Sequence, residues 1–154
     1  MYKKILVPLD GSTLAECVLP HVESIAKGCQ TKSVVFIRVV EPFYLPTGGE
    51  YAFGEKEQQQ IKAELIAAAQ NYLKELTSRL KYDGVALQSK VMEGKAADSL
   101  VEYAEKNDVD LIVIATHGRS GVSRWVWGSK ADRILRSACV PVLMVRAPGC
   151  VPGI

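Results

Sequence analysis

No apolar run in the sequence approaches the ~20 residues that a membrane-spanning helix needs. The opening stretch MYKKILVPLD has a basic pair, but its apolar run is short and already contains Pro8, so it does not predict a signal peptide. These two absences lead us to expect a cytoplasmic protein with no membrane partner.

Residues that commonly bind metals are few and scattered. The chain has 2 His and 4 Cys, and no CxxC pair or Cys/His cluster has the spacing of a zinc site. We therefore interpret Cys17, Cys29 and Cys139 as reduced packing residues. We expect Cys150 to be the most exposed and reactive thiol.

The excess of one charge sign over the other is also small. A formal net charge of +2 gives no global argument for a nucleic-acid partner, so none is expected. The 154 residues are 48% hydrophobic, which is enough to build a core of ordinary size. We expect a single domain over residues 1–147, followed by a short tail, 148–154, that contains proline and glycine.

Strand-like and helix-like segments alternate along the chain. Short β-rich runs between turn residues predict the strands, and helical spacing of apolar residues predicts the helices. The strands are expected at 3–9, 33–40, 85–92, 111–115 and 140–145, and the helices at 12–28, 57–81, 95–108 and 130–137. Strict alternation predicts an α/β fold with an open, mostly parallel sheet and right-handed crossovers.

Local signals add detail to the first two helices. Thr13 and Glu16 have the spacing of a capping box, Gly28 is the expected stop, and Pro20 should bend the helix between them. The second helix is amphipathic, and its predicted apolar stripe comprises Ile61, Leu65, Ala68, Tyr72, Leu76 and Leu80.

Two strands differ in pattern. Residues 33–40, SVVFIRVV, are nearly all apolar, as in a strand covered on both faces. Residues 85–92, VALQSKVM, alternate apolar and polar, which favours a strand near the sheet edge with one solvated face. The Pro-, Gly- and aromatic-rich residues 41–55 predict a long loop.

The expected ligand site lies where the first and fourth strands end, because open parallel sheets bind ligands at the carboxyl ends of strands where the strand order reverses. The first strand ends in PLDGS and the fourth in IATHG. Asp10 should therefore face the segment 115–129 across a crevice. Asp10 can accept hydrogen bonds from a ribose, contribute to a metal site, or simply form a turn.

The segment after the fourth strand suits an anion. Gly118 and Gly128 permit close approach of the backbone, and Ser129 opens a helix whose N-terminus attracts negative charge. Basic residues exceed acidic ones here: Arg119, Arg124, Lys130, Arg133 and Arg136 accompany Asp132. The same pattern also fits a strand-to-helix turn with a helix cap and a solvated basic face.

Several nucleotide and hydrolase motifs are missing. No G-x-G-x-x-G follows the first strand, and the chain has neither a G-x-x-x-x-G-K-[ST] loop nor a G-x-S-x-G elbow. These absences argue against a dinucleotide enzyme, a P-loop NTPase and an α/β-hydrolase.

The remaining motifs resemble those of the universal stress protein family, of the single-domain, ATP-binding type. The resemblance covers KKILVPLDGS, the run Val39-Val40-Glu41-Pro42 and the long segment from DLIVIATHGRSG to VPVLMVR. The family's ATP motif reads G-x2-G-x9-G-[S/T]. Gly118, Gly128 and Ser129 fit it, whereas Ala115 stands at the first glycine.

The resemblance implies a Rossmann-like, five-stranded parallel sheet in the order 3-2-1-4-5, with helices on both faces and ATP at the crevice. Asp10 would meet the ribose, with Ser12 beside it, and could hold Mg²⁺ indirectly. The adenine would lie among Pro8, Leu9, Val39, Ile114 and Ala115. The phosphates would lie on Gly118, Arg119, Gly128, Ser129 and Lys130.

The resemblance also implies a homodimer that pairs the fifth strands, Pro141 to Val145. We expect an ATP-binding stress-response protein that acts as a dimeric sensor or regulator, with at most slow hydrolysis or autophosphorylation and no assigned catalytic residue. The alternative is a nucleotide-free dimeric interaction module of the same fold, which Ala115 favours. An adenylyl-transfer or α-hydrolysing enzyme is disfavoured, because no S-G-G-x-D-S loop follows the first strand.

Overall fold

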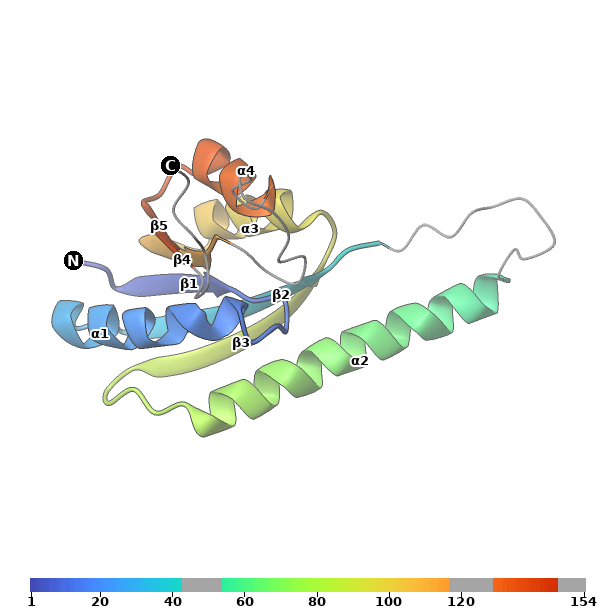
Figure 1. Cartoon of the computed structure of the whole chain (residues 1–154), viewed down its shortest axis with the longest axis horizontal. Helices are drawn as coiled ribbons and strands as arrows, with labels where there is room; N and C mark the ends of the chain where they lie inside the picture. Colours follow the sequence, from blue (N-terminus) through green and yellow to red (C-terminus); the bar gives the residue numbers. More distant parts are fainter. Residues whose placement is uncertain (43–53, 117–128, 147–154) are drawn as a thin grey trace.

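A parallel sheet of five strands forms the centre of the structure, which is a computed structural model that describes residues 1–42, 54–116 and 129–146. The strand order within these residues is β3-β2-β1-β4-β5, which confirms the predicted order (Figure 1). The strands are β1 Lys4–Pro8, β2 Ser33–Val40, β3 Ala86–Glu93, β4 Leu111–Ala115 and β5 Val142–Val145.

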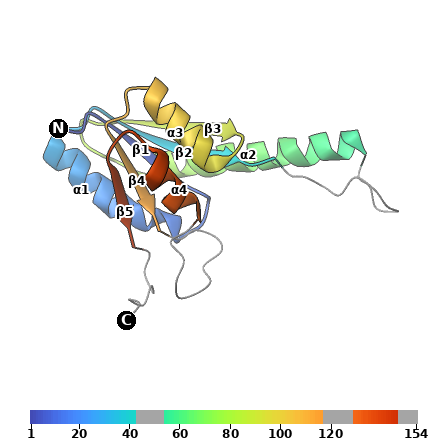
Figure 2. The same ribbon diagram turned by 90° about the horizontal axis from the view of Figure 1, so that it is seen from above.

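Helices cover both faces of the sheet, as predicted (Figures 1 and 2). One face packs on a short 3-10 helix, η1 (Ala15–Val18), and on α1 (Leu19–Cys29) and α2 (Glu55–Arg79). The other packs on α3 (Ala96–Lys106) and α4 (Ser129–Ser137). Because side chains alternate along a strand, Ile5 and Val7 enter the first core while Leu6 enters the second.

Burial along the strands matches the two sequence patterns. In β2 the residues from Val34 to Ile37 are buried, as expected for a strand covered on both faces. In β3 every residue is exposed or half-buried, and this strand ends the sheet next to β2. The predicted edge position of the third strand is confirmed.

The start of the first helical region differs from the prediction. The 3-10 turn η1 comes first, without a side-chain cap, and α1 then begins at Leu19 with Pro20 in its first turn. A proline there bends nothing, since its missing N–H has no acceptor within the helix in any case. The predicted capping box is therefore absent, and Glu16 instead accepts a hydrogen bond from Tyr72.

The end of α1 also differs from the prediction. The helix continues through Gly28 to Cys29, and Gln30 takes the left-handed conformation at φ 52° that closes it. The amides of Gln30 and Thr31 both donate to the carbonyl of Ala26. The role expected of Gly28 thus falls to Gln30, two residues later.

Helix α2 packs on the sheet along its C-terminal half only. Its buried residues are Ala69, Leu73 and Leu76, whereas Leu65 is 38% exposed and Ala68 is also exposed. Figure 1 shows the N-terminal half projecting past the carboxyl ends of the strands. The predicted stripe is therefore wrong for its first half, because the sheet ends before the helix does.

Most of the predicted loop 41–55 and the tail 148–154, which contains Cys150, lie outside the described residues. The described cysteines, Cys17, Cys29 and Cys139, are free thiols, and burial raises the pKa of Cys17. Cys17 and Cys29 are partly buried, whereas Cys139 is exposed, so its prediction as a packing residue is wrong. Within the described ranges, no helix is both long and apolar enough to cross a membrane.

Gly11 and Gly28 should respond oppositely to alanine. Gly11 has φ +84°, and an added Cβ would lie 2.9 Å from a guanidinium nitrogen of Arg38, whereas Gly28 is helical with open space around it. We expect Gly11→Ala to lower the free energy of unfolding by about 1–2 kcal/mol, and Gly28→Ala to raise it by about 0.5–1 kcal/mol. Chemical denaturation measures both, and equal effects would contradict this account.

Candidate functional site

A cavity of about 460 Å³ opens at the carboxyl ends of the strands. It lies across β1 and β4, the two neighbouring strands at which the strand order reverses. The predicted site residues that line it are Pro8, Leu9, Asp10, Val39, Ile114, Ala115, Ser129 and Lys130. Ser12 does not line the cavity but donates a hydrogen bond to Asp10, which does. Gly118, Arg119 and Gly128 lie outside the described residues.

The cavity walls are largely apolar and come from both cores. Leu9 and Ala115 belong to the core beneath α1 and α2, while Ile37 and Ile114 belong to the core beneath α3 and α4. The cavity therefore lies over the end of the sheet rather than on one face. A flat apolar ligand group could lie there against preformed walls.

Asp10 is held by a local turn. Its Oδ1 accepts a hydrogen bond from the Ser12 amide at 2.9 Å and another from the Ser12 hydroxyl at 2.6 Å. The Ser12 hydroxyl oxygen in turn accepts from the amide of Ala15 at 3.2 Å. The turn interpretation of Asp10 is therefore correct, and the same turn places Asp10 at the cavity wall.

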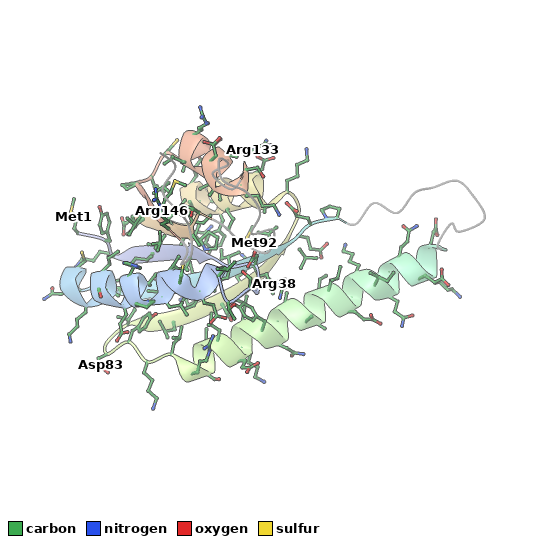
Figure 3. The ribbon with its side chains drawn as sticks, viewed as in Figure 1. Met1, Arg38, Asp83, Met92, Arg133 and Arg146 are labelled. Carbon is green, nitrogen blue, oxygen red and sulfur yellow. The ribbon has the colours of Figure 1, made fainter. Side chains whose placement is uncertain are left out.

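Arg38 is a cavity residue that the sequence reasoning missed. It lies on β2 with its guanidinium 5.6 Å from the ring centroid of Tyr72, and it packs against Gly11. Figure 3 labels Arg38 beside α2, at the end of the sheet where the cavity opens. A signal was present, since Arg38 is the one charged residue in the apolar run SVVFIRVV.

A polar cluster fixes Tyr72 beneath Arg38. The Tyr72 hydroxyl donates to Glu16 Oε1 at 2.9 Å, and the Arg79 guanidinium pairs with Glu16 Oε2. Burial and the Glu16 carboxylate both raise the pKa of Tyr72, so its hydroxyl keeps its proton. The cluster links η1 to α2 and holds the aromatic ring on which Arg38 rests.

An ion pair lies on the side of the cavity formed by α3 and α4. The Nζ of Lys130, the second residue of α4, donates to Glu41 Oε2 at 2.7 Å. Glu41 Oε1 accepts from the amide of Ala96, the first residue of α3, at 3.2 Å. Glu41 lines the cavity and was also missed, because its partners are distant in sequence.

The other basic residues of α4 have acidic partners. Arg133 pairs with Asp98 on α3 at 2.8 Å, and Arg136 pairs with Asp132 one turn earlier at 2.9 Å. Neither arginine lines the cavity. Their interpretation as a solvated basic face is therefore correct, and Lys130 is the basic residue that α4 contributes to the cavity wall.

Metal binding by side chains alone has no support in the described residues, where no group of three or more His, Cys, Asp and Glu could hold an ion. The remaining wall residues that sequence reasoning missed are Ala15, Ile37, Val40, Leu65, Ala96, Leu100, Thr116, Ala131 and Ile134. Most are apolar and come from helices, so their arrival at the cavity depends on packing rather than on a motif.

The sequence pattern of the Universal stress protein family matches residues 1–146. This chain belongs to that family. The universal stress protein MJ0531 of Methanocaldococcus jannaschii is 35% identical over 150 residues, which cover 96% of this chain and 84% of MJ0531. The solved structure of MJ0577, from the same organism, has a TM-score of 0.80 at 26% identity and covers 97% of this chain and 99% of its own.

Two more distant structures of the family hold adenine nucleotides. A universal stress protein in complex with cAMP has a TM-score of 0.64 at 19% identity, with 95% of this chain and 98% of its own covered. An Arabidopsis thaliana family protein with AMP bound has a TM-score of 0.66 at 14% identity, with 96% and 93% covered. At 19% and 14% identity, these two comparisons show that the fold is shared.

The ion pair of Glu41 should give a pH-dependent contribution to stability. The hydrogen-bonded Lys130 ammonium lowers the pKa of Glu41, and the Ala96 amide adds to this effect while burial opposes it. A carboxyl with a lowered pKa stabilises the fold above its unfolded pKa, and the contribution is lost as the pH falls through the folded pKa.

We therefore expect Glu41→Gln to lower the free energy of unfolding by about 0.2–1 kcal/mol at pH 7, since both side chains are half-exposed. The difference should begin to shrink as the pH falls below about 4.3, the ordinary pKa of Glu, and should be lost below the lowered folded pKa. High salt should also reduce it. Denaturant titrations at several pH values measure it. A difference that stays constant from pH 7 to pH 3 would contradict the ion pair.

Proposed function

We propose that this universal stress protein binds an adenine nucleotide, in the first place ATP, in the cavity at the carboxyl ends of β1 and β4. The observation that carries the proposal is the arrangement of the cavity. Apolar walls lie between an Asp10 turn on one side and the N-terminus of α4, with Ser129 and Lys130, on the other. This arrangement suits a ligand with an apolar ring, a sugar and an anionic end.

Each part of a nucleotide has a matching group in the proposal. The adenine would lie among Pro8, Leu9, Val39, Ile114 and Ala115. Asp10 would accept hydrogen bonds from the ribose hydroxyls, with Ser12 supporting its turn. The phosphates would meet the α4 N-terminus at Ser129 and Lys130, together with Gly118, Arg119 and Gly128 of the family motif.

The AMP and cAMP complexes of the two distant family members support an adenine nucleotide as the ligand class. ATP rather than AMP is the finer part of the proposal and rests on the motif Gly118-x9-Gly128-Ser129. Mg²⁺ would bind mainly through phosphate oxygens and water, with Asp10 as an indirect contributor, since Mg²⁺ retains several waters in nucleotide sites.

The protein would act as a sensor or regulator in the cytoplasm rather than as an efficient enzyme. Among the described residues, Glu41 is the carboxylate that lines the cavity near Ser129 and Lys130, where the phosphates would lie. Glu41 already accepts a hydrogen bond from Lys130, so it is not free to act as a base. At most, slow hydrolysis or autophosphorylation would occur. In the proposal, residues 1–147 form the binding domain, and the tail 148–154 lies beyond it.

The first experiment is to denature the purified protein, to which no nucleotide has been added, and identify the released small molecules by chromatography. Near-stoichiometric ATP, ADP or AMP would support the proposal. If none is released, a calorimetric titration with ATP and Mg²⁺ follows. No binding in that titration would favour the nucleotide-free interaction module, with Ala115 at the first motif glycine as its basis.

Asp10→Ala should weaken ATP binding about tenfold to a hundredfold, because a hydrogen bond to a charged group contributes about 1.5–3 kcal/mol. Asp110→Ala is the matched control. Like Asp10, Asp110 accepts two hydrogen bonds on one carboxylate oxygen; the donors are the backbone amides of Lys3 and Lys4, at 2.8 Å each, at the amino end of the sheet. Titration calorimetry measures both variants. Equal losses of affinity would place Asp10 outside the binding site.

We also propose that the protein is a homodimer paired through the fifth strand, Pro141 to Val145. β5 ends the described sheet beside β4, and Leu143 on it is 37% exposed. An exposed apolar edge strand favours pairing with another strand, because its backbone amides and carbonyls lack partners on that side.

Leu143→Glu should therefore shift the protein from dimer to monomer, because a carboxylate would enter the apolar interface. Leu135→Glu is the control, since Leu135 is 45% exposed but lies on α4 rather than on the strand. Analytical ultracentrifugation at micromolar concentration distinguishes the two states. A Leu143→Glu variant that remains dimeric would rule out this interface.

A further inference from the structure

Glu41 lies where an anionic ligand group is expected. It follows β2 directly, and its carboxylate joins the first amide of α3 to the Lys130 ammonium at the start of α4. Helix N-termini and a lysine are the groups that bind phosphate in many proteins. In this chain they already share a carboxylate.

The position of Lys130 makes this carboxylate significant. Lys130 is the second residue of α4, at the end of the helix that carries partial positive charge, so its ammonium is unfavourably placed unless an anion lies nearby. Glu41 supplies that anion at 2.7 Å. A ligand phosphate could supply it equally well, but the two anions would repel each other if both remained.

Glu41 also separates two cavities. A second cavity, of about 430 Å³, lies between the projecting half of α2 and the ends of β2 and β3. It shares Val40, Glu41 and Leu65 with the cavity across β1 and β4. A Glu41 side chain that leaves Lys130 therefore has space on its other side. The Glu41 side chain is 44% exposed, so the carboxylate would stay in contact with water during this movement.

We propose that Glu41 is a built-in competitor for the phosphate groups of the nucleotide. This inference rests on the proposed function, because it concerns the same cavity. A bound phosphate must take the place of Glu41 at Lys130, and the repulsion between the phosphate and the Glu41 carboxylate rises with the charge of the ligand. Glu41 thereby reduces the affinity gained from each added phosphate and determines how strongly ATP is preferred over AMP and adenosine.

The same exchange would report occupancy to the segment after β2. Glu41 is the first residue after that strand, and the ion pair with Lys130 ties this point to α4, 89 residues away. When phosphate takes over Lys130, this tie is lost. Glu41 therefore acts as a specificity-determining residue whose release accompanies nucleotide binding.

The test compares three ligands, adenosine, AMP and ATP, by titration calorimetry at low ionic strength. Glu41→Gln keeps an oxygen that can accept from the Ala96 amide and removes only the charge. Asp98→Asn is the matched control. The Asp98–Arg133 pair also joins α3 to α4, at 2.8 Å with side-chain exposures of 49% and 59%, close to the 44% and 59% of Glu41 and Lys130, and neither residue lines either cavity.

We expect Glu41→Gln to tighten ATP binding about fivefold to tenfold, AMP binding about twofold to threefold, and adenosine binding less than twofold. Asp98→Asn should leave all three affinities within about twofold of the wild type. In a Lys130→Gln background, Glu41→Gln should gain less for ATP, because no ion pair has to be broken.

The outcomes separate the inference from the proposed function. If the wild type binds ATP but Glu41→Gln changes all three affinities equally or not at all, the competitor role is wrong and nucleotide binding stands. If neither protein binds any of the three ligands, both the proposed function and the inference are overturned. A weaker ATP affinity in Glu41→Gln would likewise overturn the inference, since it would show that the Glu41 charge favours ATP binding rather than opposing it.

Discussion

The reversal of strand order between β1 and β4 is the constraint on which the site depends. The chain leaves β1 towards the face covered by α1 and α2, and α3 and α4 cover the other face. Since the connections diverge, neither covers the strand ends between them, and the cavity forms there. Both cores contribute to its walls, so packing on either side of the sheet determines the shape of the site.

Polar interactions at the cavity are arranged as short local bonds on one side and long-range ones on the other. The turn from Asp10 to Ala15 is held by hydrogen bonds between residues two or three positions apart. Glu41, by contrast, joins Ala96 and Lys130 from separate helices. The first side is formed by local sequence, whereas the second exists only when the sheet and both helices have assembled.

This difference explains what the sequence could predict. Period-two and helical patterns predicted the strands and helices, and the PLDGS turn placed Asp10 because its geometry is local. The strand order came from the family resemblance. Prediction was wrong at Pro20 and Gly28, where neighbouring backbone decided the helix ends, and Arg38 and Glu41 were missed because tertiary packing alone gives them their partners. Arg38 was a single charge in an apolar run, and Glu41 stood in the family-like run Val39-Val40-Glu41-Pro42 without an assigned role.

The projecting half of α2 divides one helix into two thermodynamic units. The helix is ~37 Å long, from 25 residues at ~1.5 Å each, and the buried anchors Ala69, Leu73 and Leu76 all lie in its second half. The first half depends on local bonds, such as Gly54 to Glu57 at 3.0 Å, and on the exposed Lys62–Glu93 pair. Its opening free energy is therefore small, while the second half opens only with the core. Amide protons along this single helix should thus exchange with solvent on two separate timescales, with the change near Leu65.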